Sequence, residues 1–407
     1  EIVKPSDDMF RSLFQEIIDK GTMPIYKKRP GSQHEKVLIK SFDMFQSLNA
    51  TGTPLTAIET FKPTIVNTVE KGSEPNAQFK NSFSEKYFKK VEDFLSEATN
   101  AQQKNKRTND YLTSFFVTYN GSTISTHFSY QRKMLIKAYT DREHFEDKES
   151  FIQSMGNYAD FYKYWLQYNS SSNKIFEGLD GVPGADLASM LLLFLKSSNH
   201  KMAITILGTM YSNVIEGKEN AREDFVEAIR LVGAYYFLWR SAFSNSGLDT
   251  TYREFFKKLK ENDEECTVEL IRNHMKEVLE RREIATFAQW KEKAQNYLKY
   301  DVTGIDVVRM ALLLTAHDTM PDEAHIGLMK TARVGSSTYL TLEKWCSSDL
   351  KTIEHVAPQN NRSGMWDTEL YNQQTSPYNL LGNLTLLPQE LNSSAGNKGW
   401  KEKLLYY

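Results

Sequence analysis

A glutamate and a histidine, Glu354 and His355, are adjacent near the carboxy end of the chain. An imidazole suits proton transfer because its unperturbed pKa lies near neutrality. The run Lys351–Val356 around them predicts a strand, in which neighbouring side chains point to opposite faces. Both groups can reach one site only if the strand ends or bends beside them. Ala357-Pro358 predicts that end, because proline cannot donate a ladder hydrogen bond.

Three asparagines follow the acid–imidazole pair. Asn383 lies in the leucine-rich run Leu381–Leu387, which predicts a second strand led by Gly-Asn. Asn392 and Asn397 bracket the start of a helix predicted over Asn397–Tyr407. The order strand, long loop, strand and helix would concentrate these polar residues in one small region. The alternative interpretation is a capped loop with an ordinary histidine, in which the asparagines serve turns.

This arrangement resembles the HNH, or ββα-metal, nuclease motif. More narrowly, the region is similar to the nuclease half of GmrSD-type modification-dependent restriction enzymes. The motifs that carry this similarity are Glu-His-Val-Ala-Pro-Gln, Leu-Gly-Asn-Leu-Thr-Leu-Leu and the later Gly-Asn-Lys-x-Trp-x-x-Lys. The resemblance implies that His355 is the general base that takes a proton from the water attacking a phosphodiester. It makes Glu354 and Asn392 metal ligands. Asn383 takes the place of the middle asparagine, which fixes the loop and orients the imidazole.

The implied ligands predict the kind of metal. One carboxylate and one amide oxygen suit a hard ion such as Mg²⁺, or Mn²⁺ in its place, which would stabilise the phosphate in hydrolysis. The last motif position is asparagine and not histidine, which disfavours zinc and leaves Asn392 and Asn397 as alternative ligands. Lys398, Lys401 and Lys403 are close enough on the predicted last helix to contact DNA phosphates, although they suit a solvated face equally. Trp400 is expected in the core.

The fold class that the sequence predicts is mainly α, a helical multi-domain protein with a small carboxy-terminal ββα-metal motif. Amphipathic periodicity dominates from about 76 to 335. Helices are expected over Tyr87–Leu95, Tyr158–Tyr168, Asp186–Lys196, Lys201–Ile215, Arg222–Arg240, Val268–Arg282 and Asp306–Ala316. The dense aromatic residues of this region are interpreted as packing between helices.

The expected domains are a remnant of a GmrS-like amino-terminal domain at 1–75, a helical middle domain at 76–299 and an HNH-type nuclease domain at 300–407, with its ββα core at about 350–407. The remnant is assigned because the segment Phe42–Glu59 is similar to the closing portion of the GmrS-type domain. Within it, Thr56 and Glu59 form a capping-box pattern at the start of a helix. The chain lacks an initiator methionine and ends in a helix-like stretch, so we expect a piece of a longer protein.

Composition limits the classes of function. Fifty Lys and Arg against 52 Asp and Glu give a formal net charge of −2, so a DNA-binding surface must be local. The two cysteines, Cys266 and Cys346, form no C-x-x-C pair, which argues against a disulfide framework or a cysteine zinc site. The apolar run Leu187–Leu195 is half the length that a bilayer requires. We therefore expect a soluble, cytoplasmic protein that does not bind membranes, and the resemblance implies a bacterial source.

The leading functional hypothesis is a metal-dependent DNA endonuclease or nickase that acts on foreign, modified DNA in anti-phage defence. The alternative is a catalytically silent sensor or adaptor that only binds DNA. Neither a Gly-x-x-x-x-Gly-Lys-Ser/Thr loop nor the family's Asp-Gly-Gln-Gln-Arg motif is present, so a nucleoside triphosphate would need a site outside this chain. Homodimer formation, the modification sensed and the number of strands cut stay open.

Overall fold

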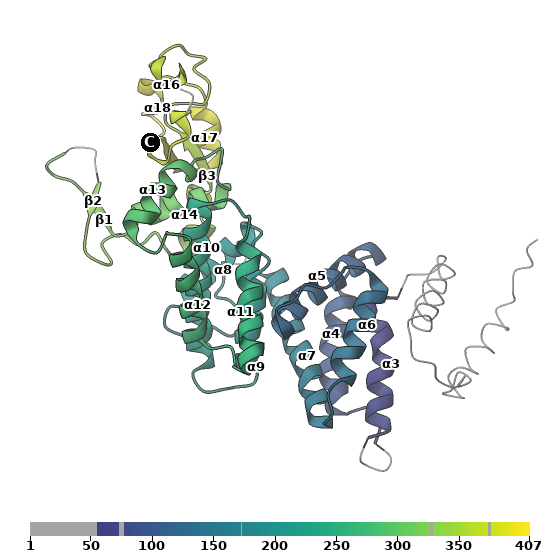
Figure 1. Ribbon diagram of the computed structural model, residues 1–407. Coiled ribbons are helices and arrows are strands. Elements are labelled where there is room, and N and C mark those ends of the chain that lie inside the picture. The colour runs from purple at the N-terminus through teal and green to yellow at the C-terminus, as the bar shows by residue number, and fades with distance from the viewer. Residues whose placement is uncertain (1–54, 73–76, 172, 326–328, 373–375) are drawn as a thin grey trace, which may run out of the picture. The chain divides into compact units, whose positions relative to one another are not determined.

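The computed structural model describes residues 55–72, 77–171, 173–325, 329–372 and 376–407 (Figure 1). The chain from Leu55 to Tyr407 forms one compact unit. The domain boundaries expected at 75/76 and 299/300 stay predictions. Most of the segment that resembles a GmrS-type domain, up to residue 54, lies outside the described residues.

The fold is mainly helical, as the sequence predicts. The first helices are α3 (Ala57–Glu70), α4 (Phe83–Ser96), α5 (Ala101–Asn120), α6 (Phe128–Thr140), α7 (Phe145–Gln167), α8 (Ala185–Ser197) and α9 (Ala203–Ile215). They are followed by α10 (Ala221–Ala242), α11 (Leu248–Asn262), α12 (Val268–Arg281), α13 (Phe287–Tyr297) and α14 (Ile305–Ala316). Every helix predicted from periodicity is present, and most differ only slightly at their ends. The exception is the helix expected over Tyr158–Tyr168, because α7 already begins at Phe145.

Local capping explains where several helices begin. The backbone N–H of Glu59 donates to the Thr56 hydroxyl, and the Glu59 carboxylate accepts from the backbone N–H of Thr56, which confirms the predicted capping box. Ser82 and Asn100 cap α4 and α5 in the usual way, each with a side-chain oxygen that accepts from a first-turn N–H. The caps satisfy backbone donors that the helices themselves leave unpaired.

The helices bury one continuous hydrophobic core, rich in aromatic side chains. In this core α4 packs against α7, α3 against α6, and α10 against α8, α9 and α12. Trp239, Tyr235 and Tyr252 are among the largest side chains that are almost wholly buried. The prediction that the aromatic residues serve helix packing is thereby confirmed for this part of the chain.

The carboxy-terminal part contains two small antiparallel hairpins. β1 (Thr319–Pro321) pairs with β2 (Met329–Thr331), and β3 (Thr352–His355) pairs with β4 (Leu384–Leu387). Short helical segments complete this part: α15 (Leu342–Cys346), η1 (Ser348–Leu350), α16 (Glu369–Asn372), η2 (Pro377–Asn379), η3 (Leu381–Asn383), α17 (Gln389–Ala395) and α18 (Trp400–Lys403). The yellow end of the chain in Figure 1 holds β3, α16, α17 and α18.

Helix α14 supports the second hairpin. Val308 and Leu312 on α14 form a small hydrophobic cluster with Ile353 of β3 and Leu384 of β4. Arg309, which is 8% exposed, donates to the carbonyl oxygens of Leu350 (2.8 Å) and Trp345 (2.5 Å), just before β3. These contacts fix the strand that carries Glu354 and His355.

Two expectations about secondary structure are wrong. The helical signal expected up to about 335 is interrupted by the β1–β2 hairpin, which contains Pro321 at the end of a short strand. The single helix expected over Asn397–Tyr407 is only the short α18. It is separated from α17 by Gly396, whose positive φ of 45° favours glycine. Among the described residues, no helix combines the length and apolarity needed to span a bilayer.

A buried histidine in the helical core predicts acid sensitivity. Burial, and to a smaller extent the charge of Arg240, lower the pKa of His200 from 6.5 to about 3. Its Nε2 lies 2.6 Å from the Tyr252 hydroxyl. The folded protein keeps this ring neutral, whereas the unfolded chain takes up a proton below pH 6.5. The stability contributed by the neutral ring is therefore present above pH 6.5 and is lost as the pH falls toward 3.

The test compares His200→Gln, which keeps a hydrogen-bonding group beside Tyr252, with the wild type. The free energy of unfolding of the wild type should decline more steeply between pH 6.5 and 4, by about 1.4 kcal/mol per pH unit. Urea denaturation at several pH values measures the difference. Parallel curves for the two proteins would show that His200 does not carry the effect.

Candidate nuclease site at the β3–β4 hairpin

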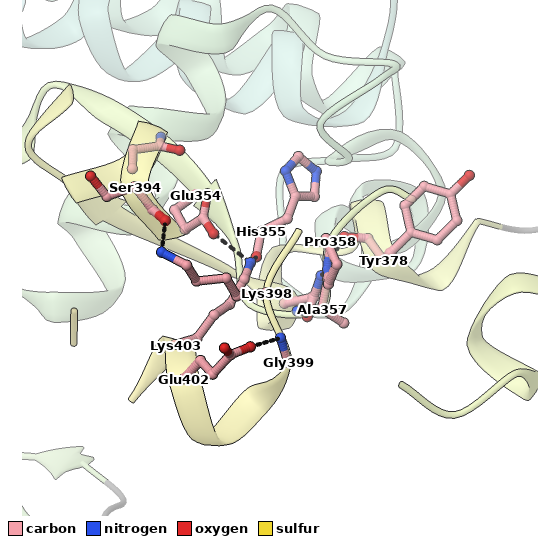
Figure 2. A network of polar contacts seen from close by, with 12 residues as sticks. Glu354, His355, Ala357, Pro358, Tyr378, Ser394, Lys398, Gly399, Glu402 and Lys403 are labelled. Carbon is pink, nitrogen blue, oxygen red and sulfur yellow. Dashed lines mark hydrogen bonds and ion pairs between the residues drawn. The ribbon is translucent and has the colours of Figure 1, made fainter. Parts of the chain in front are cut away.

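The β3–β4 hairpin divides the candidate residues between its two faces. Antiparallel pairing places His355 opposite Leu384 and Glu354 opposite Thr385. Side chains alternate along a strand, so His355 shares the face of Ile353, which packs on α14, and Glu354 lies on the other face. Figure 2 shows the imidazole of His355 pointing away from the carboxylate of Glu354. The two groups are neighbours in sequence but do not contact each other.

Asn379 holds the His355 ring. His355 Nε2 lies 3.1 Å from Asn379 Oδ1, which also accepts from Gln359 Nε2 at 3.2 Å. A carbonyl oxygen can only accept, so Nε2 carries the ring proton and Nδ1 carries the lone pair. The Tyr300 ring packs edge-on against the imidazole at 4.5 Å, and the Tyr300 N–H donates to the Asn379 carbonyl. The ring is thereby fixed in the tautomer whose Nδ1 can accept a proton.

The surroundings of His355 favour the neutral imidazole. Burial lowers its pKa below the ordinary value and the charge of Lys403 acts in the same direction, while the hydrogen bond to Asn379 partly opposes them. His355 is 8% exposed. A substrate can therefore contact only the edge of the ring that its neighbours leave uncovered. A neutral, oriented imidazole with this much access is suited to act as a base.

Asn383 fixes the backbone just after β3. Its Oδ1 accepts from the Ala357 N–H at 2.8 Å, and its Nδ2 donates to the carbonyl oxygens of Ala357 (2.8 Å) and Tyr378 (2.7 Å). Its main-chain oxygen also accepts from Val356. These contacts hold the loop, whereas the direct hydrogen bond to His355 comes from Asn379.

Asn392 lies on the Glu354 face of the hairpin. From α17, its Nδ2 donates to Thr352 Oγ1 (2.9 Å) and to the Ile353 carbonyl (3.0 Å). The Asn392 amide nitrogen therefore donates both of its hydrogen bonds to β3, and its Oδ1 is the atom that could bind a cation. Asn397, the alternative ligand, lies in the turn between α17 and α18. Contacts thus place Asn392 beside the hairpin.

Glu354 is paired with a lysine that the sequence interpretation assigned to DNA. The Lys403 side chain is fully buried, and its Nζ lies 2.5 Å from Glu354 Oε1 and 2.6 Å from the His355 carbonyl oxygen. Figure 2 shows Lys403 reaching from α18 toward the strand. Burial and the nearby Glu354 carboxylate raise the pKa of Tyr407. Lys403 cannot contact DNA phosphates in this position, so that expectation is wrong.

The remaining predicted residues of the last helix differ in exposure. Lys398 Nζ contacts the Ser394 carbonyl (Figure 2). It also lies 2.6 Å from the Tyr406 hydroxyl. Lys401 is exposed on α18 and is free to meet a phosphate. Trp400 is 46% exposed, so its expected place in the core is wrong. Its indole ring contacts the rings of Trp366 and Tyr407.

The oxygen donors on the Glu354 face have the chemistry of a hard-cation site. A carboxylate and an amide oxygen are ligands that Mg²⁺ accepts. The ammonium of Lys403, held by a carboxylate and a carbonyl oxygen, is a cation already bound by such donors. Among the residues that the structure describes, no three His, Cys, Asp or Glu side chains gather where they could hold a metal. A smaller ligand set of one carboxylate and one amide remains compatible with the donors present.

Comparison with known proteins points to the same region. Residues 322–407 match the family model described as the C-terminal domain of GmrSD restriction endonucleases. No curated protein matches the chain. The match includes β3, β4, α17 and α18, and it implies a restriction nuclease family with a DNA substrate. It confirms the resemblance drawn from the carboxy-terminal motifs: residues 322–407 are a GmrSD restriction endonuclease C-terminal domain.

Proposed function

We propose that the carboxy-terminal domain hydrolyses phosphodiester bonds of foreign, modified DNA as a metal-dependent endonuclease or nickase. The observation that carries this proposal is the oriented His355 ring, whose Nε2 is bound to Asn379 and whose Nδ1 carries the lone pair. The match of residues 322–407 to a restriction endonuclease domain supports DNA as the substrate. The proposal includes a role in anti-phage defence in the bacterial cytoplasm.

His355 is the proposed general base. Its Nδ1 takes a proton from water as the water oxygen forms a bond to phosphorus, and the bond from phosphorus to the leaving sugar oxygen breaks. Asn379 keeps Nε2 protonated during this step, so the imidazole accepts its proton only at Nδ1. Asn383 holds the loop behind the ring through Ala357.

Glu354 and Asn392 are the proposed holders of a divalent cation, Mg²⁺ or Mn²⁺. Endonucleases of this kind typically need such an ion, which when bound stabilises negative charge on the phosphate. Lys401 is the exposed cation of the last helix that can meet the DNA backbone, and Lys398 is a weaker candidate because it already has two partners. Residues 1–75, 76–299 and 300–407 remain the proposed domain division.

A plasmid assay tests the proposal. Supercoiled plasmids with plain or modified cytosines are incubated with the chain in Mg²⁺, in Mn²⁺ or in excess EDTA, with and without nucleoside triphosphate. We expect nicked or linear product in the divalent cations, more from modified DNA, and none in EDTA. Equal product in EDTA would contradict the cation requirement. DNA binding that weakens with salt but yields no cleavage in any arm would favour the silent sensor or adaptor.

A further inference from the structure

Lys403 is a buried cation in contact with the proposed metal ligand. Its side chain is fully buried, and the Glu354 side chain is 6% exposed. A buried ammonium is stable only when it is paired and hydrogen-bonded. Lys403 obtains both from Glu354 Oε1 at 2.5 Å and the His355 carbonyl at 2.6 Å (Figure 2). The ion pair therefore balances the charge of Glu354 within the chain itself.

The ammonium and a divalent cation need the same donors. Carboxylate and carbonyl oxygens are hard ligands for Mg²⁺ and Mn²⁺. Two positive charges a few ångströms apart in a buried site repel each other strongly. A cation that binds Glu354 must either displace the Lys403 ammonium or tolerate its charge, and both weaken binding.

We propose that Lys403 competes with the divalent cation for Glu354 and thereby sets the cation affinity of the nuclease site. The inference rests on the proposed role of Glu354 as a metal ligand. When the ammonium is bound to Glu354, the two charges balance. The ion pair then also holds α18 against β3. Binding of the cation frees the ammonium from the carboxylate. The occupancy of Glu354 by a divalent cation then depends on the concentration of that cation and on competition from the Lys403 ammonium.

Calorimetric titration with MnCl₂ in the absence of DNA tests the competition. Lys403→Met, which keeps the length of the side chain but removes its charge, should bind Mn²⁺ at least about tenfold more tightly than the wild type. Lys351→Met, which removes one positive charge from an exposed position just before β3, should bind as the wild type does. Glu354→Gln/Lys403→Met should lose the gain, because it lacks the carboxylate.

Thermal unfolding gives a second readout. Lys403→Met removes the cation that is paired with the buried Glu354 carboxylate, so its melting temperature in EDTA should fall below that of the wild type. Mn²⁺ should raise the melting temperature of the variant by more than it raises that of the wild type. Lys403→Gln, whose amide can still donate to Glu354, serves if the methionine variant does not fold.

The outcomes separate this inference from the proposed function. If Glu354→Gln weakens Mn²⁺ binding but neither Lys403 variant strengthens it, competition is overturned and the ligand role of Glu354 stands. If Glu354→Gln changes neither Mn²⁺ binding nor plasmid cleavage, the ligand role fails and the competition fails with it. Stronger binding by a Lys403 variant together with loss in the double variant supports the competition.

Discussion

His355→Ala is expected to lower the rate of DNA cleavage by about 10²–10⁴-fold, the usual contribution of a positioned general base. The reason is that Nδ1 of this ring is the proposed acceptor of the water proton, and Asn379 leaves Nε2 protonated. The measurement is the initial rate of plasmid nicking at saturating Mn²⁺. Because the ring lies at the end of a strand supported by α14, the variant should keep its circular dichroism spectrum.

A matched control is available within the same domain. His325 is exposed, and its Nδ1 lies 2.8 Å from Asp322 Oδ2 in the same turn. His325→Ala should cleave DNA at the wild-type rate, which would separate loss of the base from loss of any histidine. If His355→Ala cuts as well as the wild type while cleavage still needs the cation, another group is the base.

Asn379→Leu is expected to lower the cleavage rate by about 10²-fold or more, with little change in DNA binding. Leucine has a similar volume but cannot accept, so His355 Nε2 and Gln359 Nε2 both lose the oxygen that they share. The ring would then be free to change its tautomer, a loss known to be severe for catalytic histidines. The same substitution also costs stability, because Asn379 is 3% exposed and the buried His355 ring would lose its hydrogen-bond partner.

Two measurements distinguish orientation of the ring from general damage. The rate constant at saturating DNA should fall while the binding constant stays close to that of the wild type. Asn379→Gln, which can still present a carbonyl oxygen, should recover part of the rate. Asn360→Ala is the control, since this asparagine is exposed in the loop that follows Gln359. An equal loss for leucine and glutamine without any recovery would argue that Asn379 serves only the fold.

The sequence predicted the helical framework well because local periodicity and capping determine it. Thr56 and Glu59 are three residues apart, so the capping box is visible in the sequence and is present in the structure. The strands around Glu354 and Leu384 were likewise predicted, since β-branched and leucine-rich runs bounded by Pro and Gly mark them. The order of these elements carried the family resemblance.

The contacts within the site could not be predicted in the same way. Asn379 was missed because its partner His355 is 24 residues earlier, and an asparagine before Leu-Leu-Gly-Asn gives no separate signal. Lys403 is 49 residues from Glu354, and a lysine in a short terminal helix is normally exposed. Only the folded hairpin brings these groups together.

Helix α14 belongs to two hydrophobic clusters at once. Val307 and Leu313 face the large helical core, while Val308 and Leu312 cover Ile353 of the hairpin. A fragment cut at residue 322, where the family match begins, would lose this helix and leave the apolar side of the hairpin open to water. We therefore expect the matched segment to be unstable when it is separated from α14. A fragment that contains the β3–β4 hairpin should therefore also include α14, which covers its apolar face.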